Sequence, residues 1–142
     1  MAEKEKIQAE EIVIDAENAV LGRTAAFAAK QALYGKKVAI VNCDNMIIIG
    51  NPDSILEHYK HKITRGSTEY GPYYPKIVEK LVKRVIRGML PYKKKRGSEA
   101  FKMIRCYKKV PAEYANKKKL DFKKELRFST NYITIENLCK LL

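Results

Sequence analysis

A row of basic side chains between residues 76 and 87 has the spacing of one helical face. Its members lie at offsets of 0, 4, 7, 8 and 11 residues: Lys76, Lys80, Lys83, Arg84 and Arg87. Like charges one turn apart destabilise a free helix by about 0.2–0.5 kcal/mol per pair, and Glu79 alone offers relief nearby. A solvated face usually mixes both signs of charge, and so this row favours contact with the phosphates of a polyanion.

Two further groups of basic residues follow the row. The run from Lys93 to Arg96 comes directly after Pro91 and before another expected helix, which favours a rigid loop that contacts phosphates. Runs of this kind also occur in disordered tails and nuclear localisation signals. Lys102 and Arg105 are expected to extend the same surface. A third cluster contains Lys117, Lys118, Lys119, Lys123 and Lys124.

Residues 64–75 form a loop that combines Arg65 with three tyrosines, Tyr70, Tyr73 and Tyr74, between glycines and prolines that break regular structure. Exposed aromatic rings beside basic residues can stack on unpaired bases or on sugars. The alternative is that Tyr73 and Tyr74 pack back on the protein with their hydroxyls outward. The sequence does not separate the two.

Gly88 is an unusual residue inside the helix expected at 76–90, because glycine within a helix costs roughly 0.5–1 kcal/mol relative to alanine. Either close packing of the helix end or close approach of a nucleic-acid backbone can require it. Gly88 lies four residues after Arg84, on the basic row and away from the centre of the apolar face. The sequence therefore favours approach of the nucleic acid.

The sequence lacks the motifs of an enzyme. His58 and His61 have no third ligand and no H-E-x-x-H pattern around them, and neither a phosphate-binding glycine loop nor a nucleophile elbow occurs. The three cysteines are widely spaced and are expected to be small buried hydrophobes. We expect no catalytic residue, no cofactor, no metal and no small-molecule substrate.

Net charge supports a polyanionic partner. The chain has 29 basic and 16 acidic residues, a net charge of +13, with −3 in residues 1–59 and +16 in residues 60–142. Nucleic acid is the first candidate and an anionic membrane surface the second. No apolar run is long enough to span a bilayer, and the charged start has no signal-peptide core. These two observations predict a cytoplasmic protein. Of the two candidate partners we expect nucleic acid, and no membrane.

The hydrophobic pattern predicts alternating strands and helices. Strands are expected at 12–14, 38–41 and 46–49, and the last two can form a hairpin or stay separate. Helices are expected at 22–34, from Asn51-Pro52 onward, at 76–90, at about 98–105, and after a Thr134 cap. A final strand can include Tyr107 and Val110. We predict a mobile polar tail at 1–10 and a single α/β domain at 11–142, with a largely parallel sheet.

Several strings of this sequence resemble, in order, the ribosomal protein L13 family of the large ribosomal subunit. They are IVIDA (12–16), LGRTAA (21–26), GKKVAIVN (35–42), IIIGN (47–51), IRGMLP (86–91), RGSEAF (96–101) and IRCYKKVP (104–111). The resemblance runs from about Ile12 to Pro111 and more weakly from Ile133 to Leu142. The compact length and the form of Tyr70 to Pro75 resemble the archaeal branch of the family.

The resemblance implies a three-layer α/β/α fold with a four-stranded parallel sheet. It also implies binding to large-subunit ribosomal RNA early in assembly, neighbouring ribosomal proteins as partners, and no catalysis. A nucleotide-dependent enzyme would explain only the α/β pattern, and a free-standing nucleic-acid regulator only the charge. The residues expected to bind RNA are Arg23, Arg65, Tyr73, Tyr74, Lys76, Lys80, Lys83, Arg84, Arg87, Gly88, Lys93, Lys94, Lys95, Arg96, Lys102 and Arg105.

Overall fold

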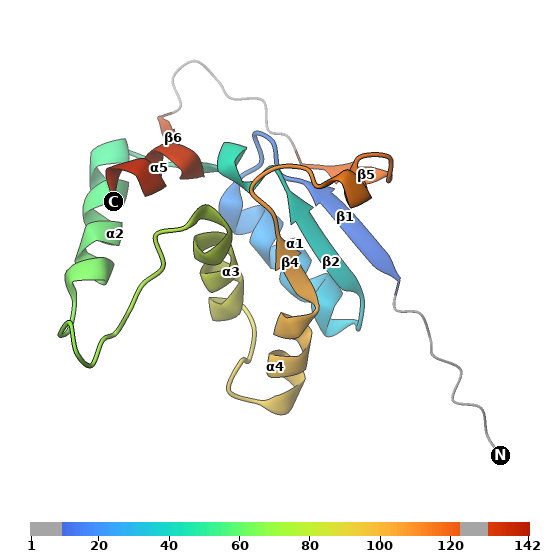
Figure 1. Ribbon diagram of the computed structural model, residues 1–142, viewed down its shortest axis with the longest axis horizontal. Helices are drawn as coiled ribbons and strands as arrows, with labels where there is room; N and C mark the ends of the chain where they lie inside the picture. Colours follow the sequence, from blue (N-terminus) through green and yellow to red (C-terminus); the bar gives the residue numbers. More distant parts are fainter. Residues whose placement is uncertain (1–9, 123–130) are drawn as a thin grey trace.

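A four-stranded parallel sheet forms the centre of the computed structural model, which describes residues 10–122 and 131–142. Its strands are β1 (Glu11–Asp15), β2 (Lys37–Val41), β4 (Ile104–Cys106) and β5 (Lys119–Asp121). They lie in the order β4-β2-β1-β5, and every neighbouring pair is parallel (Figure 1). The predicted α/β class and the mainly parallel four-stranded sheet are confirmed.

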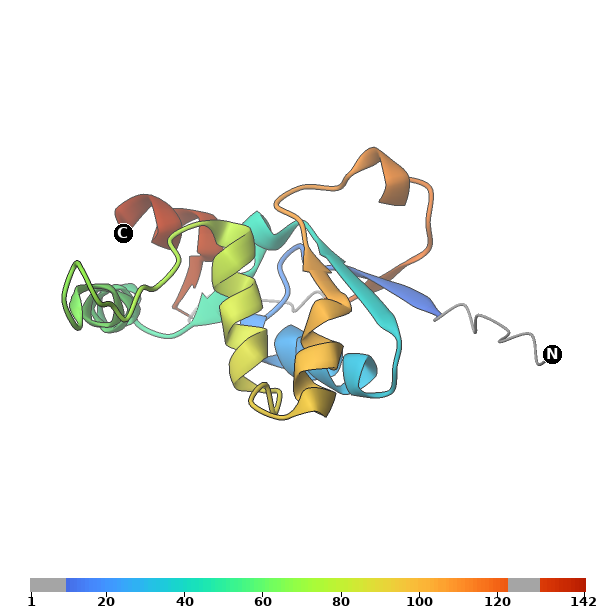
Figure 2. The same ribbon diagram turned by 60° about the horizontal axis from the view of Figure 1, so that its bottom comes forward.

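One face of the sheet packs against three helices, α1 (Leu21–Leu33), α3 (Val78–Gly88) and α4 (Lys95–Lys102). Because side chains alternate along a strand, Ile14, Val38 and Ile40 all point into this layer and are buried. The alanines of α1 are small and let that helix lie close to the strands. Figure 2 shows α3 and α4 as neighbours, both close to α1.

The opposite face of the sheet has a thinner cover. Val13, Ala39 and Val41 form a second, smaller apolar cluster with Tyr114. Tyr114 ends a single 3-10 turn, η2 (Ala112–Tyr114), and its hydroxyl donates a hydrogen bond of 2.9 Å to the Glu11 carboxylate. In the described part of the chain, the third layer over this face is therefore a turn and its flanking loop.

The strands at 38–41 and 46–49 do not form a hairpin. A 3-10 turn, η1 (Cys43–Asn45), separates β2 from β3 (Ile47–Ile49), which pairs antiparallel with β6 (Tyr132–Thr134) in a second sheet. The helix α5 (Ile135–Leu141) follows β6, and the Thr134 side chain caps it as predicted. Asn51 likewise caps α2 (Pro52–Thr64). Figures 1 and 2 place α3 between the main sheet and the pair α2 and α5.

Several predicted boundaries are wrong around residues 95–110. The helix expected at about 98–105 is α4, which begins at Lys95 and ends at Lys102. The final strand lies before Tyr107, because Ile104 pairs with Val38 of β2 and buries its side chain in the core. The helix expected at 76–90 is α3, two residues shorter at each end. Of the predicted tail, residues 1–9 lie outside the described residues.

Burial of the apolar face of α3 predicts a large difference between two isoleucines. Ile86 is 0% exposed in the core, whereas Ile77, at the N-cap of α3, is 53% exposed. Replacing Ile86 with alanine is expected to lower the free energy of unfolding by about 2–5 kcal/mol. Ile77→Ala, the same substitution at the surface, is expected to cost about 0.5 kcal/mol or less.

Urea unfolding of the full-length variants measures both effects as shifts of the midpoint at an unchanged slope. Equal destabilisation by the two substitutions would contradict the packing described here.

Candidate nucleic-acid interface

The amphipathic helix α3 presents its basic residues away from the core. Val78, Leu81, Val82 and Ile86 are buried, so that the opposite side of the helix faces solvent. Lys80 is exposed on that side, and Lys76 is exposed in the extended segment just before the helix. Neither Lys76 nor Lys80 makes a hydrogen bond or ion pair with a described residue, and both amines are free to meet an anion. The remaining three basic residues of the row are half-buried: Lys83, Arg84 and Arg87.

Arg84 fixes the loop that joins α2 to α3. Its guanidinium lies 5.5 Å from the Tyr74 ring centroid and donates a hydrogen bond of 3.3 Å to the Tyr73 carbonyl. The Lys62 amine of α2 lies 5.4 Å from the same Tyr74 ring and 5.0 Å from the Tyr59 ring. The Tyr74 ring therefore contacts cations of both α2 and α3, which is the contact within the protein that the sequence left open.

Burial disfavours the ionised form of these two tyrosines. It raises the pKa of Tyr59 to about 12, and it raises the pKa of Tyr74 although the nearby guanidinium of Arg84 acts in the opposite direction. The two rings meet nearly edge to face, with centroids 6.0 Å apart. The cluster is therefore an uncharged aromatic pair that two cations clamp.

The other two half-buried cations of α3 contact rings that follow the helix. The Arg87 guanidinium lies 4.7 Å from the Tyr92 ring centroid, and the Lys83 amine lies 4.7 Å from the Phe101 ring centroid. Tyr92 belongs to the connection between α3 and α4, and Phe101 belongs to α4. Each contact is worth about 0.5–1 kcal/mol at an exposed site. The basic row is therefore held in place by aromatic residues of its own chain.

The basic run after Pro91 lies in a tight connection. Lys93 and Lys94 precede α4, whereas Lys95 and Arg96, predicted in a loop, form the first residues of that helix. All four side chains are exposed: Lys93, Lys94, Lys95 and Arg96. The Lys94 amide donates a hydrogen bond of 2.9 Å to the Pro91 carbonyl. A side chain at Gly97 would overlap that same carbonyl, which shows how closely the helix approaches the connection.

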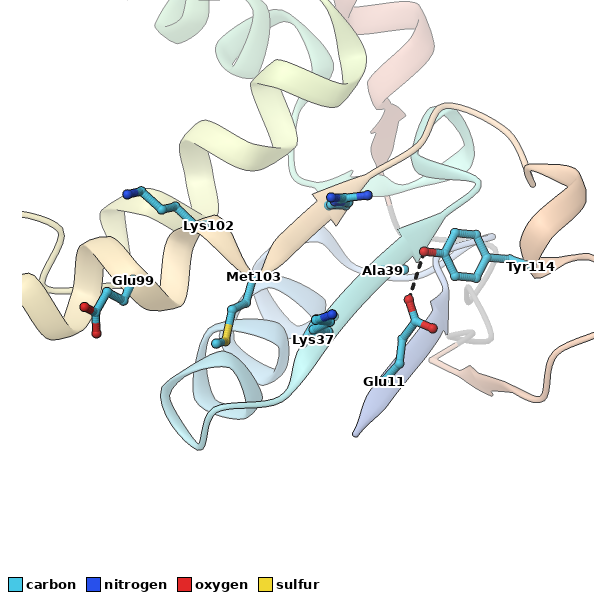
Figure 3. Close-up of a pocket in the computed structure, with 9 residues that line it drawn as sticks. Glu11, Lys37, Ala39, Glu99, Lys102, Met103 and Tyr114 are labelled. Carbon is cyan, nitrogen blue, oxygen red and sulfur yellow. Dashed lines mark hydrogen bonds between the residues drawn. The ribbon is translucent and has the colours of Figure 1, made fainter. Parts of the chain in front are cut away.

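Arg105 joins the α3 surface to the thinly covered face of the sheet. With Lys80 and Lys83 it lines a hollow of about 260 Å³ beside α3. With Lys37 and Lys102 it also lines a second hollow, of about 430 Å³, over the sheet. Figure 3 shows this hollow with Lys37 and Lys102 labelled. One arginine on the edge strand β4 therefore connects two groups of lysines into a continuous basic surface.

Of the two acidic residues that line the second hollow, Glu11 and Glu99, Glu11 is already paired within the protein. Glu11 accepts hydrogen bonds from the Lys117 amine at 2.7 Å and from the Tyr114 hydroxyl at 2.9 Å, the latter drawn in Figure 3. These bonds hold the pKa of Glu11 below its usual value. Lys37 and Arg105 form no ion pair with any described residue, so their charge remains available at this face.

Lys37 is a member of this surface that the sequence analysis missed. The string Gly35-Lys36-Lys37 is only the end of a helix when no strand pairing is known. Arg105 pairs with Ala39 in the parallel ladder, and Lys37 lies two residues before Ala39 on the same face. The alternation of Lys37 with the buried Val38 is the available clue, but it identifies a face only once the neighbouring strand is placed.

Three other predicted residues, Arg65, Arg23 and Gly88, line neither of the two hollows that Arg105 joins. Arg65 lines a hollow of about 410 Å³ within its own loop, together with Tyr73 and Lys76. Arg23 is exposed in the first turns of α1 and lines none of these three hollows. Gly88 is exposed, and a side chain there would meet no atom within 4 Å. Internal packing therefore does not explain Gly88.

The described residues offer no competing chemical centre. Within residues 10–122 and 131–142, no three His, Cys, Asp or Glu side chains gather into a possible metal site. Over the same residues, the helices are all too short or too polar to cross a membrane. The three cysteines are free thiols; Cys43 is buried as predicted, whereas Cys106 and Cys139 are only half-buried.

The sequence profile of the family described as ribosomal protein L13 matches residues 9–113. The chain belongs to the ribosomal protein L13 family. This membership confirms the predicted resemblance, and the family is one of structural ribosomal proteins and not of enzymes. The matched segment contains α3, α4 and β4, the elements that carry the basic surface.

Relatives in this family are archaeal proteins named large ribosomal subunit protein uL13. The protein of Methanopyrus kandleri is 50% identical over 99 residues, which cover 70% of this chain and 62% of the relative. That of Methanocaldococcus jannaschii is 39% identical over 134 residues, which cover 92% of this chain and 96% of the relative. The aligned part thus spans less than two thirds of the first protein and nearly all of the second. The predicted archaeal type is confirmed.

The two helical glycines at either end of the α3–α4 connection predict opposite effects of one substitution. Gly97→Ala places a methyl group against the Pro91 carbonyl and is expected to lower the free energy of unfolding by about 1–3 kcal/mol. Gly88→Ala enters open space and is expected to leave stability equal or raise it by up to about 1 kcal/mol. Thermal melting of the free protein compares the two variants. A lower melting temperature for Gly88→Ala would show that Gly88 is required for packing of the helix end.

Proposed function

We propose that this protein is a structural constituent of the large ribosomal subunit that binds large-subunit ribosomal RNA. In this proposal it supports subunit assembly and translation in the cytoplasm, without a cofactor and without catalysis. The observation that carries the proposal is the basic surface that runs from α3 through Arg105 to the thin face of the sheet. Family membership and the names of the relatives support the same conclusion.

The charge balance of this surface favours RNA over an ordinary solvated face. The α3–α4 surface consists of Lys37, Lys76, Lys80, Lys83, Arg84, Arg87, Lys93, Lys94, Lys95, Arg96, Lys102 and Arg105. Among the acidic residues beside it, Glu79 accepts the Lys108 amide, and Glu99 lies on α4. So dense a positive surface gains free energy when the counterions of bound phosphates are released.

The aromatic contacts of the row also suit this role. Side chains that already lie against rings lose less freedom when they meet a phosphate than free lysines do. We infer that Arg84 and Arg87 present fixed charges, while Lys76 and Lys80 adapt to the RNA. Arg23 and the Arg65 loop would contact RNA outside the α3–α4 surface, and other large-subunit proteins would be neighbours.

We further infer that residues 11–142 act as one domain. The main apolar cluster supports this inference, because it joins Ile14 of β1 with Leu81 of α3 and Leu138 of α5. A shared core of this kind holds α3, which carries much of the basic surface, in a fixed position relative to the main sheet and to α5.

Sedimentation of a cell lysate tests the proposed function directly. The protein is expected to travel with large ribosomal subunits in a one-to-one ratio and to leave them only at high salt. Recovery of the protein away from subunits at low salt would reject the proposal.

A matched pair of lysine substitutions tests which surface carries the RNA. Lys80→Gln is expected to reduce the slope of log affinity against log salt by about 0.7–0.9, the value for one lost phosphate contact. Lys30→Gln removes the same charge from an exposed site on α1 and is expected to leave the slope unchanged. Filter binding of full-length protein to large-subunit ribosomal RNA at several salt concentrations gives both slopes. Equal slopes for the two variants would show that general charge, and not the α3–α4 surface, drives binding.

Gly88 allows a separate test of close approach by RNA. Because its position is open, Gly88→Ala is expected to weaken RNA binding while the free protein stays folded. Gly22→Ala is the control, since a side chain at that exposed helical glycine also meets no atom within 4 Å. The same filter-binding titration decides, and unchanged affinity for Gly88→Ala would show that RNA does not approach this helix end.

A further inference from the structure

The loop between α2 and α3 contains a closed turn at residues 67–71, shortly after the end of α2. The Ser67 amide donates to the Gly71 carbonyl at 3.2 Å, and the Gly71 amide donates to the Ser67 carbonyl at 3.0 Å. The Tyr70 amide donates to the Ser67 hydroxyl oxygen at 3.0 Å. The backbone of Tyr70 is therefore fixed by its own turn, without help from the rest of the protein.

The base of this turn is also anchored. The Tyr73 hydroxyl lies 2.9 Å from the Thr68 carbonyl and 2.8 Å from the Glu69 carbonyl, within donating distance of either. Gly66, at a φ of +87°, packs so closely that a side chain would overlap the Gly71 carbonyl. Tyr73 and Tyr74, the two tyrosines predicted to bind RNA, thus both have contacts inside the protein.

Tyr70 differs from these two tyrosines because its side chain lies almost entirely in solvent. It is 88% exposed, the most exposed large hydrophobic side chain among the described residues, and its hydroxyl makes no hydrogen bond with them. A large ring held in water on a fixed turn contributes nothing to folding by burial. Its position is instead suited to a partner outside the chain.

The surroundings of the turn favour a nucleic-acid partner. Arg65 and Lys76 line the hollow beside the turn, and both are exposed and without an ion pair among the described residues. Glu69 is the acidic residue of the turn itself. Two cations in a hollow that Ser67 and Thr68 of the turn also line, on the same loop as a solvent-exposed ring, suit the phosphates and bases of a single strand. A protein contact would instead favour a wider apolar surface.

We propose that Tyr70 stacks on an unpaired base of large-subunit ribosomal RNA, with Arg65 and Lys76 at the flanking phosphates. This inference rests on the proposed function and adds a second kind of contact to it. The major groove of an A-form helix is too narrow for side chains, and an aromatic ring reaches bases only in loops, bulges or single strands. Tyr70 would therefore bind an unpaired segment, while the α3–α4 surface binds backbone phosphates.

A single tryptophan provides a direct probe, because the chain contains none. Tyr70→Trp is expected to fold normally and to lose fluorescence when large-subunit ribosomal RNA is added, since a stacked base quenches indole emission. Tyr34→Trp is the matched control at a ring that is 64% exposed near the end of α1. Figures 1 and 2 place the end of α1 far from the α2–α3 loop. The control is expected to keep its fluorescence.

Affinity measurements separate stacking from charge. Tyr70→Ala is expected to weaken RNA binding by about 5- to 150-fold, the range for loss of one base–aromatic stack. The slope of log affinity against log salt should not change, because no phosphate contact is removed. Tyr70→Phe keeps the ring and is expected to bind within about twofold of the original protein. Melting of the free Tyr70→Ala variant should be unchanged.

Two results would overturn this inference. One is equal RNA affinity of Tyr70→Ala and the original protein, with Tyr70→Trp fluorescence unaffected by RNA. The other is a fluorescence change that appears only when other large-subunit proteins are added, which would assign Tyr70 to a protein contact. In either case an effect of Lys80→Gln on the salt dependence would leave the proposed function standing.

Discussion

The burial of one face of α3 is the constraint on which the basic surface depends. Leu81, Val82 and Ile86 are fully buried, and each such side chain contributes about 1.5–3 kcal/mol when it leaves water. Repulsion between like charges one turn apart costs about 0.2–0.5 kcal/mol per pair. The apolar face therefore outweighs the repulsion severalfold. A helix that would be poor on its own becomes stable when it lies between the main sheet and α5, and its charges follow the position that the core dictates.

Aromatic rings allow these charges to act in two ways. Lys83, Arg84 and Arg87 each lie over a ring from a different segment: Phe101 of α4, Tyr74 of the α2–α3 loop and Tyr92 of the α3–α4 connection. A ring face attracts a cation without neutralising it, unlike a carboxylate. The side chains can thus hold three segments together and still carry a full positive charge at the surface. Ion pairs in the same places would stabilise the loops and cancel the field.

The features that could be predicted from the sequence are those that depend on local pattern. The β-branched runs around Ile14 and Ile40 identify buried strands, and Asn51 and Thr134 cap helices as their types suggest. The short strand β4 could not be predicted, since three residues carry no usable period and its place comes from pairing with β2. Contacts between distant residues also could not be predicted at the candidate RNA-binding surface. The spacing of charges identifies Lys80 from the sequence. Only the folded structure shows that the Tyr74 ring contacts Arg84, whereas the Tyr70 ring is exposed to solvent.

The strand order of the main sheet means that the sheet can be completed only late in synthesis of the chain. Strand β5 pairs with β1, and Tyr114 reaches Glu11 across 103 residues of sequence. Strand β6 likewise closes the small sheet on β3, far earlier in the chain. During synthesis both early strands must therefore wait, with an unpaired edge, for segments made much later. Unpaired edges of this kind favour aggregation of a nascent chain, and early capture by a polyanion or a chaperone would cover them during that interval.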